Sequence, residues 1–231
     1  MGIAKFLAFP VVFAMFWACG EVEGGFDVSS SSGSQNCTGK NCLSSSSNAS
    51  SSSSFDIGLD WVPAPENSHV HGEVEITLDD YYISKNLITQ KQYKTVMGKN
   101  PSKGELKDTL PIEGVSWFMA VEFCKKLSRL MGLDSNAIKL PTEAEWEFVV
   151  IPGLIQKNTD YWEWTNDCWD ERFPYEPNNP SGPPNCLPYQ EKVRKGFASK
   201  IEDRYATDPS LEDISMSHIS FRVVRKKKFL D

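Results

Sequence analysis

The 231-residue chain lacks a basic excess and has little histidine. Its 24 Lys and Arg are outnumbered by 31 Asp and Glu, which gives a net charge of −7, and it has three histidines. This charge argues against a nucleic-acid partner, because binding to phosphates needs a basic face. The short basic run Arg225–Lys228 lies at the C-terminal end and is typical of a solvated tail.

The first nineteen residues have the pattern of a bacterial export signal. Lys5 supplies a positive charge, and the 13 apolar residues Phe6–Ala18 are too few for a membrane-spanning helix of about 20 residues. Cys19 follows the small residue Ala18, as in a lipobox. We therefore expect residues 1–18 to be a lipoprotein signal peptide and Cys19 to be lipidated, which would anchor the protein in a bilayer. An uncleaved or ordinary secretory peptide is the alternative.

Residues 19–54 are predicted to be a disordered tether. Fourteen of the 26 residues in Ser29–Ser54 are serine, so this stretch has almost nothing to bury against its conformational entropy. Cys37 and Cys42 enclose four residues and could close a small disulfide loop in an oxidising compartment. A zinc half-site is the alternative, although no matching second pair is present.

The remaining residues, 55–231, have the pattern of one α+β domain. Three helices are predicted from N-cap residues at Thr89, Ser116 and Thr142. Strands are predicted at Trp61–Pro63 and Val74–Leu78, with Tyr81–Ile83 continuing the sheet. The third helix is expected to be half-buried. After Val150 the chain is rich in Pro, Gly, Asn and aromatic residues and shows little periodicity, which indicates irregular structure.

Five ordered segments resemble motifs of the formylglycine-generating enzyme, or sulfatase-modifying factor, family. They are NLITQKQYKTVMGKNPS (86–102), LPIEGVSWFMAVEFCKKLS (110–128), LPTEAEWEF (140–148), YWEWTND (161–167) and SFRVVR (220–225). The resemblance implies a C-type-lectin-like α+β fold. It also shows a deletion, since about a dozen residues separate the third helix from YWEWTND where the family has several tens.

The resemblance implies a copper(I) enzyme, but the copper ligands are missing. Family enzymes hold the metal with two thiolates after a segment that matches Val193–Ala198 here, and soft thiolates suit copper(I). Ser199–Asp213 contains no cysteine, and Lys200 stands near the expected position. The sequence therefore predicts a domain without this catalysis and makes copper binding improbable. A divergent oxidoreductase acting on protein cysteine is the alternative.

Two other metal sites are candidates. The resemblance places Glu163 at a position that helps to hold calcium in the family, and Asp160 is a nearby oxygen ligand. Alternatively, Glu163 pairs with an arginine and the neighbouring tryptophans fill the core. The alternate residues His69, His71 and Glu73 could converge on a metal from one strand face, or simply face solvent.

The remaining cysteines suggest a second disulfide. Cys168 and Cys186 lie at the two ends of a loop-rich segment of an exported chain, so we predict that they are bonded to each other. Functional thiols at these two positions are the alternative. Cys124 is predicted to be a buried core thiol.

A binding role is the function that the sequence favours. We expect a membrane-anchored lipoprotein of the cell envelope, on the outer membrane or its periplasmic face, whose domain is a non-catalytic binding or scaffold module. Its partners would be the bilayer, through Cys19, and an envelope protein or glycan. The loop aromatics Trp169, Phe173 and Tyr175 are the candidate ligand-binding residues. An exposed aromatic groove would favour binding over a purely structural role.

Overall fold

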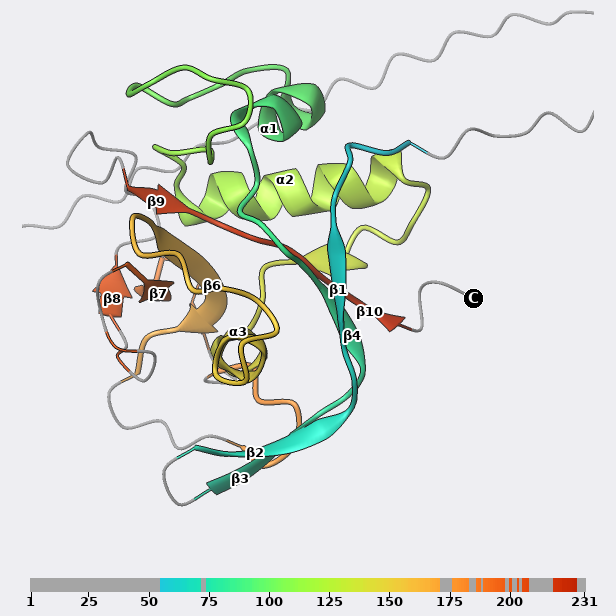
Figure 1. Ribbon diagram of the computed structural model, residues 1–231, viewed down its shortest axis with the longest axis vertical. Helices are drawn as coiled ribbons and strands as arrows, with labels where there is room; N and C mark the ends of the chain where they lie inside the picture. The colour runs from blue at the N-terminus through green and yellow to red at the C-terminus, as the bar shows by residue number, and fades with distance from the viewer. Residues whose placement is uncertain are drawn as a thin grey trace, which may run out of the picture. The chain divides into compact units, whose positions relative to one another are not determined.

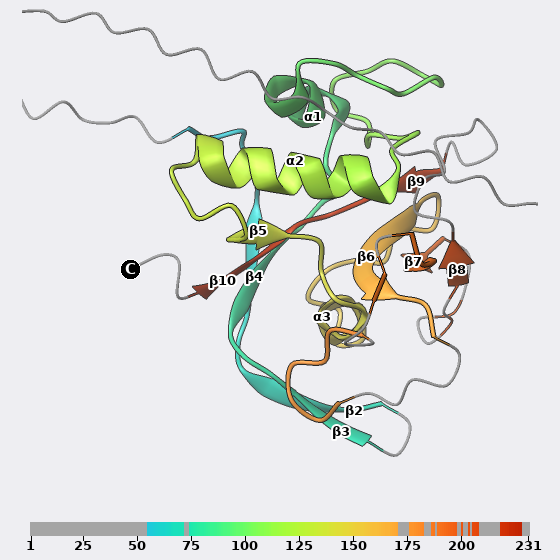
Figure 2. The same cartoon turned by 180° about the vertical axis from the view of Figure 1, so that it is seen from behind.

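The computed structural model describes the C-terminal domain of the chain (Figures 1 and 2). The described residues are 55–71, 74–170, 176–182, 186–187, 189–197, 200, 203, 205–207 and 218–227. The predicted signal peptide and tether lie outside them, with Cys19, Cys37 and Cys42. Phe173 and Tyr175 also lie outside the described residues.

Two antiparallel strand pairs begin the domain. β1 (Trp61–Ala64) pairs with β4 (Tyr81–Ser84), and β2 (Asn67–His71) pairs with β3 (Val74–Leu78). The alternation predicted for Val74–Leu78 is confirmed, because Ile76 and Leu78 are buried. Tyr81–Ile83 is a strand as expected, but it pairs with β1 rather than extending the β2–β3 pair.

The first four-stranded sheet joins distant parts of the chain. Its strand order is β1-β4-β10-β5, in which β5 is Ile138–Lys139 and β10 is Val224–Lys226. β10 lies antiparallel to both of its neighbours. The C-terminal strand therefore lies inside this sheet and holds β4 to the chain segment that follows the second helix.

Three helices begin at the N-caps predicted from the sequence. They are α1 (Gln90–Met97), α2 (Trp117–Leu130) and α3 (Glu143–Val150), and Thr89, Ser116 and Thr142 cap them. Thr89 and Thr142 form complete capping boxes with Gln92 and Glu145. Within the part of the chain that the structure describes, no helix has the length and apolarity needed to cross a membrane.

A second sheet has the order β8-β7-β6-β9 and lies apart from the first. Its strands are β6 (Trp162–Cys168), β7 (Lys192–Gly196), β8 (Tyr205–Thr207) and β9 (Ile219–Ser220). β9 is parallel to β6, whereas the other pairs are antiparallel. The short β9 thus brings the end of the chain back beside the YWEWTND segment.

Helix α3 lies between the two four-stranded sheets (Figures 1 and 2). Its apolar residues, among them Trp146 and Val149, pack against residues of β1, β3, β4 and β10, and the helix also contacts β6 and β7. All eight of its residues are buried. The prediction of a half-buried helix was wrong, because its polar side also faces protein.

The C-terminal segment crosses from the second sheet to the first. β9 leads through residues 221–223 directly into β10, and Figure 1 shows the two strands almost in line. The connection is held by backbone bonds from Ile88 N to Phe221 O and from Ser84 N to Val223 O, both 2.9 Å. Arg222 therefore lies where the two sheets meet.

Candidate functional site

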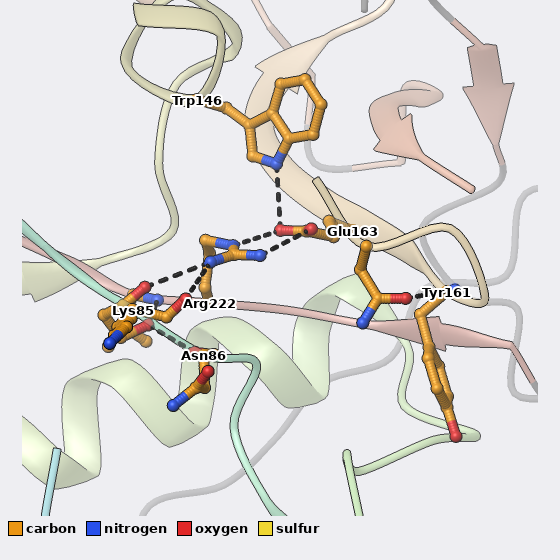
Figure 3. A network of polar contacts seen from close by, with 9 residues as sticks. Lys85, Asn86, Trp146, Tyr161, Glu163 and Arg222 are labelled. Carbon is orange, nitrogen blue, oxygen red and sulfur yellow. Dashed lines mark hydrogen bonds and ion pairs between the residues drawn. The ribbon is translucent and has the colours of Figure 1, made fainter. Parts of the chain in front are cut away.

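Glu163 and Arg222 form a buried ion pair between the sheets (Figure 3). Arg222 donates from Nε to Glu163 Oε2 at 2.5 Å and from Nη2 to Oε1 at 2.9 Å. Trp146 Nε1 donates to the same Oε2 at 3.0 Å. Arg222 Nη1 also donates to the carbonyls of Ser84 and Lys85 at 3.2 and 2.7 Å. The pair therefore connects β6, α3 and the end of β4.

This arrangement does not fit the calcium ion considered for Glu163. The guanidinium of Arg222 already faces both carboxylate oxygens, so a cation occupies the place where a calcium ion would bind. Asp160 is exposed, in the loop before β6. The structure instead gives Glu163 the arginine partner that the sequence offered as the alternative. Among the described residues, no group of three or more His, Cys, Asp or Glu side chains could hold a metal ion.

Two residues of the histidine candidate lie on β2. His69 and His71 occupy alternate positions of β2, opposite Ile76 and Val74 of β3. Glu73, the third residue of that candidate, lies outside the described residues. The proposal that these three residues bind a metal stays a prediction.

The glutamates of α3 have buried cationic partners that sequence reasoning missed. Lys195 Nζ lies 3.2 Å from Glu143 Oε1 and 2.6 Å from Glu147 Oε1, and all three side chains are almost completely buried. Glu145 is buried too, and Lys226 Nζ lies 3.2 Å from its Oε1. The i, i+4 spacing of Glu143 and Glu147 could have indicated that one cation faces both.

A cavity of about 630 Å³ lies beside Arg222. Its walls come from the loop before α1, the loop before α2 and the short connection between α3 and β6. They are lined by Lys85, Asn86, Leu87, Thr89, Thr109, Pro111, Gly153, Leu154, Ile155, Gln156, Lys157, Asn158 and Arg222. Three of these residues are cationic, and one of them, Arg222, is already paired with Glu163.

A second surface is aromatic and extends over β6, β7 and β8 of the second sheet. Trp162 stacks on Phe197, with ring centroids 5.3 Å apart, and meets the ring of Tyr205 edge-on at 4.7 Å. The guanidinium carbon of Arg194 lies 4.3 Å from the centroid of Trp162. Trp162, Arg194 and Phe197 are half-buried and Tyr205 is 37% exposed. We call these four residues the aromatic face.

The aromatic face rests on ordered backbone. Trp162 N donates to His218 O at 2.7 Å, and Phe197 N donates to Tyr161 O at 2.9 Å. Phe197 has a positive φ of 53°, a conformation uncommon outside glycine, which sets the direction of its ring. Burial lowers the pKa of Arg194, and the nearby Tyr205 opposes that shift. The face is therefore a fixed surface with a cation stacked on an indole ring.

The aromatic residues singled out from the sequence are divided between core and surface. Trp164 is fully buried, as expected for a core residue, and donates from Nε1 to Val115 O at 2.9 Å. Trp162, also expected in the core, is only half-buried and belongs to the aromatic face. Trp169 is half-buried at the end of β6, while Phe173 and Tyr175 lie outside the described residues. Ligand binding by these three residues stays a prediction.

The structure joins Cys168 to Cys186 through a disulfide, with their Cα atoms 5.8 Å apart. Lys192 Nζ lies 2.9 Å from each of the two sulfur atoms. Cys124 is a free, buried thiol in the core, as expected, and burial raises its pKa well above the ordinary range. Cys168 is buried as well, whereas Cys186 is half-buried.

The segment expected to precede a copper site does not provide ligands for that metal. Its strand, β7, carries Lys192, Arg194 and Lys195, and the last cysteine of the chain, Cys186, precedes it. Copper(I) needs soft thiolate or thioether ligands, and cationic side chains cannot supply them. The two cysteines beside β7, Cys168 and Cys186, are joined in a disulfide and so offer no thiolate pair, and no reaction step through copper follows.

The described residues form an α+β domain with the C-type-lectin-like fold of formylglycine-generating enzymes. Residues 54–161 match the family described as "Sulfatase-modifying factor enzyme 1-like domain". This match covers just under half of the chain and confirms the resemblance that the motifs indicated. This match ends just before β6, which is the first strand of the second sheet along the chain.

Three solved structures share the fold. Treponema denticola variable protein 1 has a TM-score of 0.57 at 18% identity, covering 73% of this chain and 94% of its own. PvdO from Pseudomonas aeruginosa has a TM-score of 0.57 at 14% identity, covering 72% and 94%. CarF has a TM-score of 0.52 at 15% identity, covering 73% and 98%.

A curated relative is the chaperone protein LppX of Paenibacillus barcinonensis. It is 30% identical over a match that covers 42% of this chain and 48% of LppX. The match thus spans about half the length of that relative.

Proposed function

We propose that the protein is a cell-envelope lipoprotein, anchored through Cys19, whose domain binds a polypeptide and does not convert cysteine to formylglycine. The observation that carries this proposal is the aromatic face, in which Trp162, Phe197 and Tyr205 lie together and partly exposed beside Arg194. An exposed aromatic groove was the feature expected to favour a binding module over a purely structural protein, and the aromatic face supports the proposal as a partly exposed aromatic surface.

The composition of the aromatic face favours a protein partner. Tryptophan, tyrosine and arginine are the residues that most often dominate binding energy at protein interfaces. Aromatic rings offer a large contact area while losing little side-chain entropy, and an arginine stacked on a ring keeps donors at its edge. Tyr205 and Arg194 both contact Trp162, so the three side chains form one continuous surface.

The rigidity of the surface also supports binding. Trp162 on β6 lies diagonally across from Arg194 on β7, because Arg194 is the register partner of Trp164. Tyr205 on β8 is the register partner of Arg194. Side chains fixed by a sheet lose little freedom when a partner binds, which lowers the entropy penalty of association. The scaffold therefore presents its contact residues in a preformed arrangement.

The likeness to LppX favours a polypeptide over a glycan as the partner. LppX is named a chaperone, and a chaperone acts on another protein. The stacked rings alone would also suit a sugar, so the partner class rests on that name together with the arginine at the surface. A divergent oxidoreductase is the runner-up function, and thiol chemistry near Cys168 and Cys186 is the observation that would favour it.

Comparative capture from the cell envelope tests the proposal. The purified protein and its Trp162→Ala, Arg194→Ala and Leu130→Ala variants would be incubated with solubilised envelope proteins, and bound polypeptides quantified by mass spectrometry. Leu130 is the matched control, because it is 41% exposed and lies at the end of α2. Loss of a hot-spot contact of about 2 kcal/mol weakens binding roughly thirty-fold.

The expected result is a polypeptide that binds the wild type and the Leu130 variant but is strongly depleted with both face variants. Equal recovery by all four proteins would contradict the proposal. A glycan array provides the other comparison: glycan binding that depends on Trp162, with no face-dependent polypeptide, would replace the polypeptide by a sugar.

A further inference from the structure

The ammonium group of Lys192 is buried against the Cys168–Cys186 disulfide. Lys192 is 2% exposed, and its Nζ lies 2.9 Å from both sulfur atoms and 4.2 Å from the ring centroid of Trp117. No carboxylate of the described residues is within ion-pair distance of this ammonium. The negative charge of Asp167 raises the pKa of Lys192 from a greater distance. The two sulfurs and the indole ring are therefore its nearest partners.

This environment is unfavourable for an ammonium beside an intact disulfide. A buried charge needs a counter-charge or strong acceptors, and sulfur is a weak acceptor. Burial accordingly lowers the pKa of Lys192, and Asp167 opposes the shift. If one sulfur became a thiolate, the same 2.9 Å contact would be a charge-assisted hydrogen bond between an ammonium and an anion.

From this contact we propose that Cys168–Cys186 is a redox-active disulfide that exchanges electrons with a dithiol of another envelope protein, Lys192 stabilising the reduced state. A disulfide is a stronger oxidant when its reduced form is stabilised, and a neighbouring lysine lowers the pKa of a thiol. The proposal is independent of the aromatic face, because it needs neither Trp162 nor Tyr205.

The difference in burial between the two cysteines sets the order of the steps. A thiolate of the donor attacks Sγ of the half-buried Cys186, the S–S bond breaks, and Cys168 leaves as a thiolate beside Lys192. The second donor thiolate then attacks the mixed disulfide, and Cys186 leaves and takes up a proton. Two electrons pass from the donor dithiol to the domain, the donor becomes a disulfide, and the second thiol proton goes to solvent.

The surroundings of Cys186 suit a protein donor. Leu187 is 68% exposed and Tyr189 is 83% exposed, and the ring of Tyr189 lies 5.8 Å from that of Phe118. These apolar groups flank the sulfur that would be attacked, whereas Cys168 is 1% exposed. A partner protein could contact them while its cysteine reaches Cys186.

Redox titration of the full-length protein tests the role of Lys192. Wild type, Lys192→Met and Lys192→Arg would be equilibrated in glutathione buffers at neutral pH, and the disulfide fraction measured by alkylation and mass spectrometry. We expect Lys192→Met to shift the equilibrium toward the disulfide about ten-fold, the effect of roughly one pKa unit, and Lys192→Arg to remain near wild type. Equal equilibria for wild type and Lys192→Met would overturn the proposal.

A measurement on the wild type alone keeps the proposal testable if Lys192→Met does not fold. In the reduced protein, thiolate absorbance should show one thiol that ionises clearly below the ordinary cysteine pKa of about 8.5. Cys124 is the internal control, because it is buried without a lysine contact and burial raises its pKa. Absence of any thiolate at neutral pH would refute the proposal.

A comparison of two reductants tests whether a protein dithiol or a small thiol is the preferred electron donor. Faster reduction by a protein dithiol than by glutathione at equal thiol concentration is the expected result, because Leu187 and Tyr189 offer a protein a contact surface. Equal or faster reduction by glutathione would rule out the protein donor.

Discussion

Glu163 and Arg222, 59 positions apart in the sequence, share two hydrogen bonds of 2.5 and 2.9 Å in the interior of the domain. Glu163 belongs to the second sheet, while Arg222 lies on the segment that leads into the first. Arg222 also binds the carbonyls of Ser84 and Lys85, at the end of β4. This pair is thus a polar link between the two sheets, at a place where the cores on either side are apolar.

Removing one partner of this pair should strongly destabilise the domain. We expect Arg222→Met to lower the free energy of unfolding by about 3–5 kcal/mol, because a buried carboxylate loses its cation. Urea denaturation would measure the change. Arg129→Met is the matched control: its ion pair with Glu122 is exposed, so the loss should stay within about 1 kcal/mol. A similar small loss for Arg222→Met would show that the buried pair does not support the fold.

Lys195 should be equally sensitive, because one cation faces two buried glutamates. Lys195→Met takes the ammonium away from Glu143 and Glu147, and we expect a loss of about 3–5 kcal/mol in unfolding free energy. Lys91→Met, on the exposed side of α1, should change stability by less than about 0.5 kcal/mol. Chemical denaturation followed by tryptophan fluorescence gives both values, and equal values would contradict the assignment.

Calcium should have little effect on the domain. Because Arg222 faces both oxygens of Glu163, we expect calcium and a chelator to give the same melting temperature, measured by differential scanning fluorimetry. Isothermal titration with calcium chloride provides a second readout. Tight binding of one calcium ion that disappears in Glu163→Gln would restore the metal site inferred from the family resemblance.

Lipidation of Cys19 is a separate prediction, since this residue lies outside the described part of the chain. Cells that express the wild type should incorporate a palmitate analogue into the protein, and Cys19→Ala should not. The wild type should also sediment with membranes, because acyl chains contribute about 0.8 kcal/mol per buried CH₂ group. Equal labelling of both proteins would exclude Cys19 as the lipidated residue.

Local signals in the sequence were sufficient for the helices but not for the contacts between the sheets. Thr89, Ser116 and Thr142 could be predicted as caps because a cap depends on residues within one turn. The spacing of Glu143 and Glu147 could indicate a shared cation, but it could not identify that cation as Lys195, which lies some fifty positions later. The wrong expectation of a half-buried helix came from the helical spacing of Trp146 and Val149, which indicates one apolar face and not the burial of the other side.

In the candidate site, too, the sequence predicts some residues, whereas their partners depend on the fold. The family resemblance drew attention to Glu163 and left either an arginine or a calcium ion as its partner. The partner is identified as Arg222 only by the fold, in which residues 221–223 cross from the second sheet to the first. Trp162 was assigned to the core because the motif pairs it with Trp164. On β6 the two residues take different environments, since Trp164 is fully buried whereas Trp162 stacks on Phe197 at the surface.

Photo-crosslinking in living cells tests the central claim, polypeptide binding at the aromatic face, most directly. A photoreactive phenylalanine analogue would replace Tyr205 in one strain and Leu130 in another, since both side chains are partly exposed. The account predicts a discrete crosslinked polypeptide from position 205 that is lost when Arg194→Ala is added, and none of that species from position 130. No crosslinked polypeptide from position 205, or the same species from both positions, would contradict it.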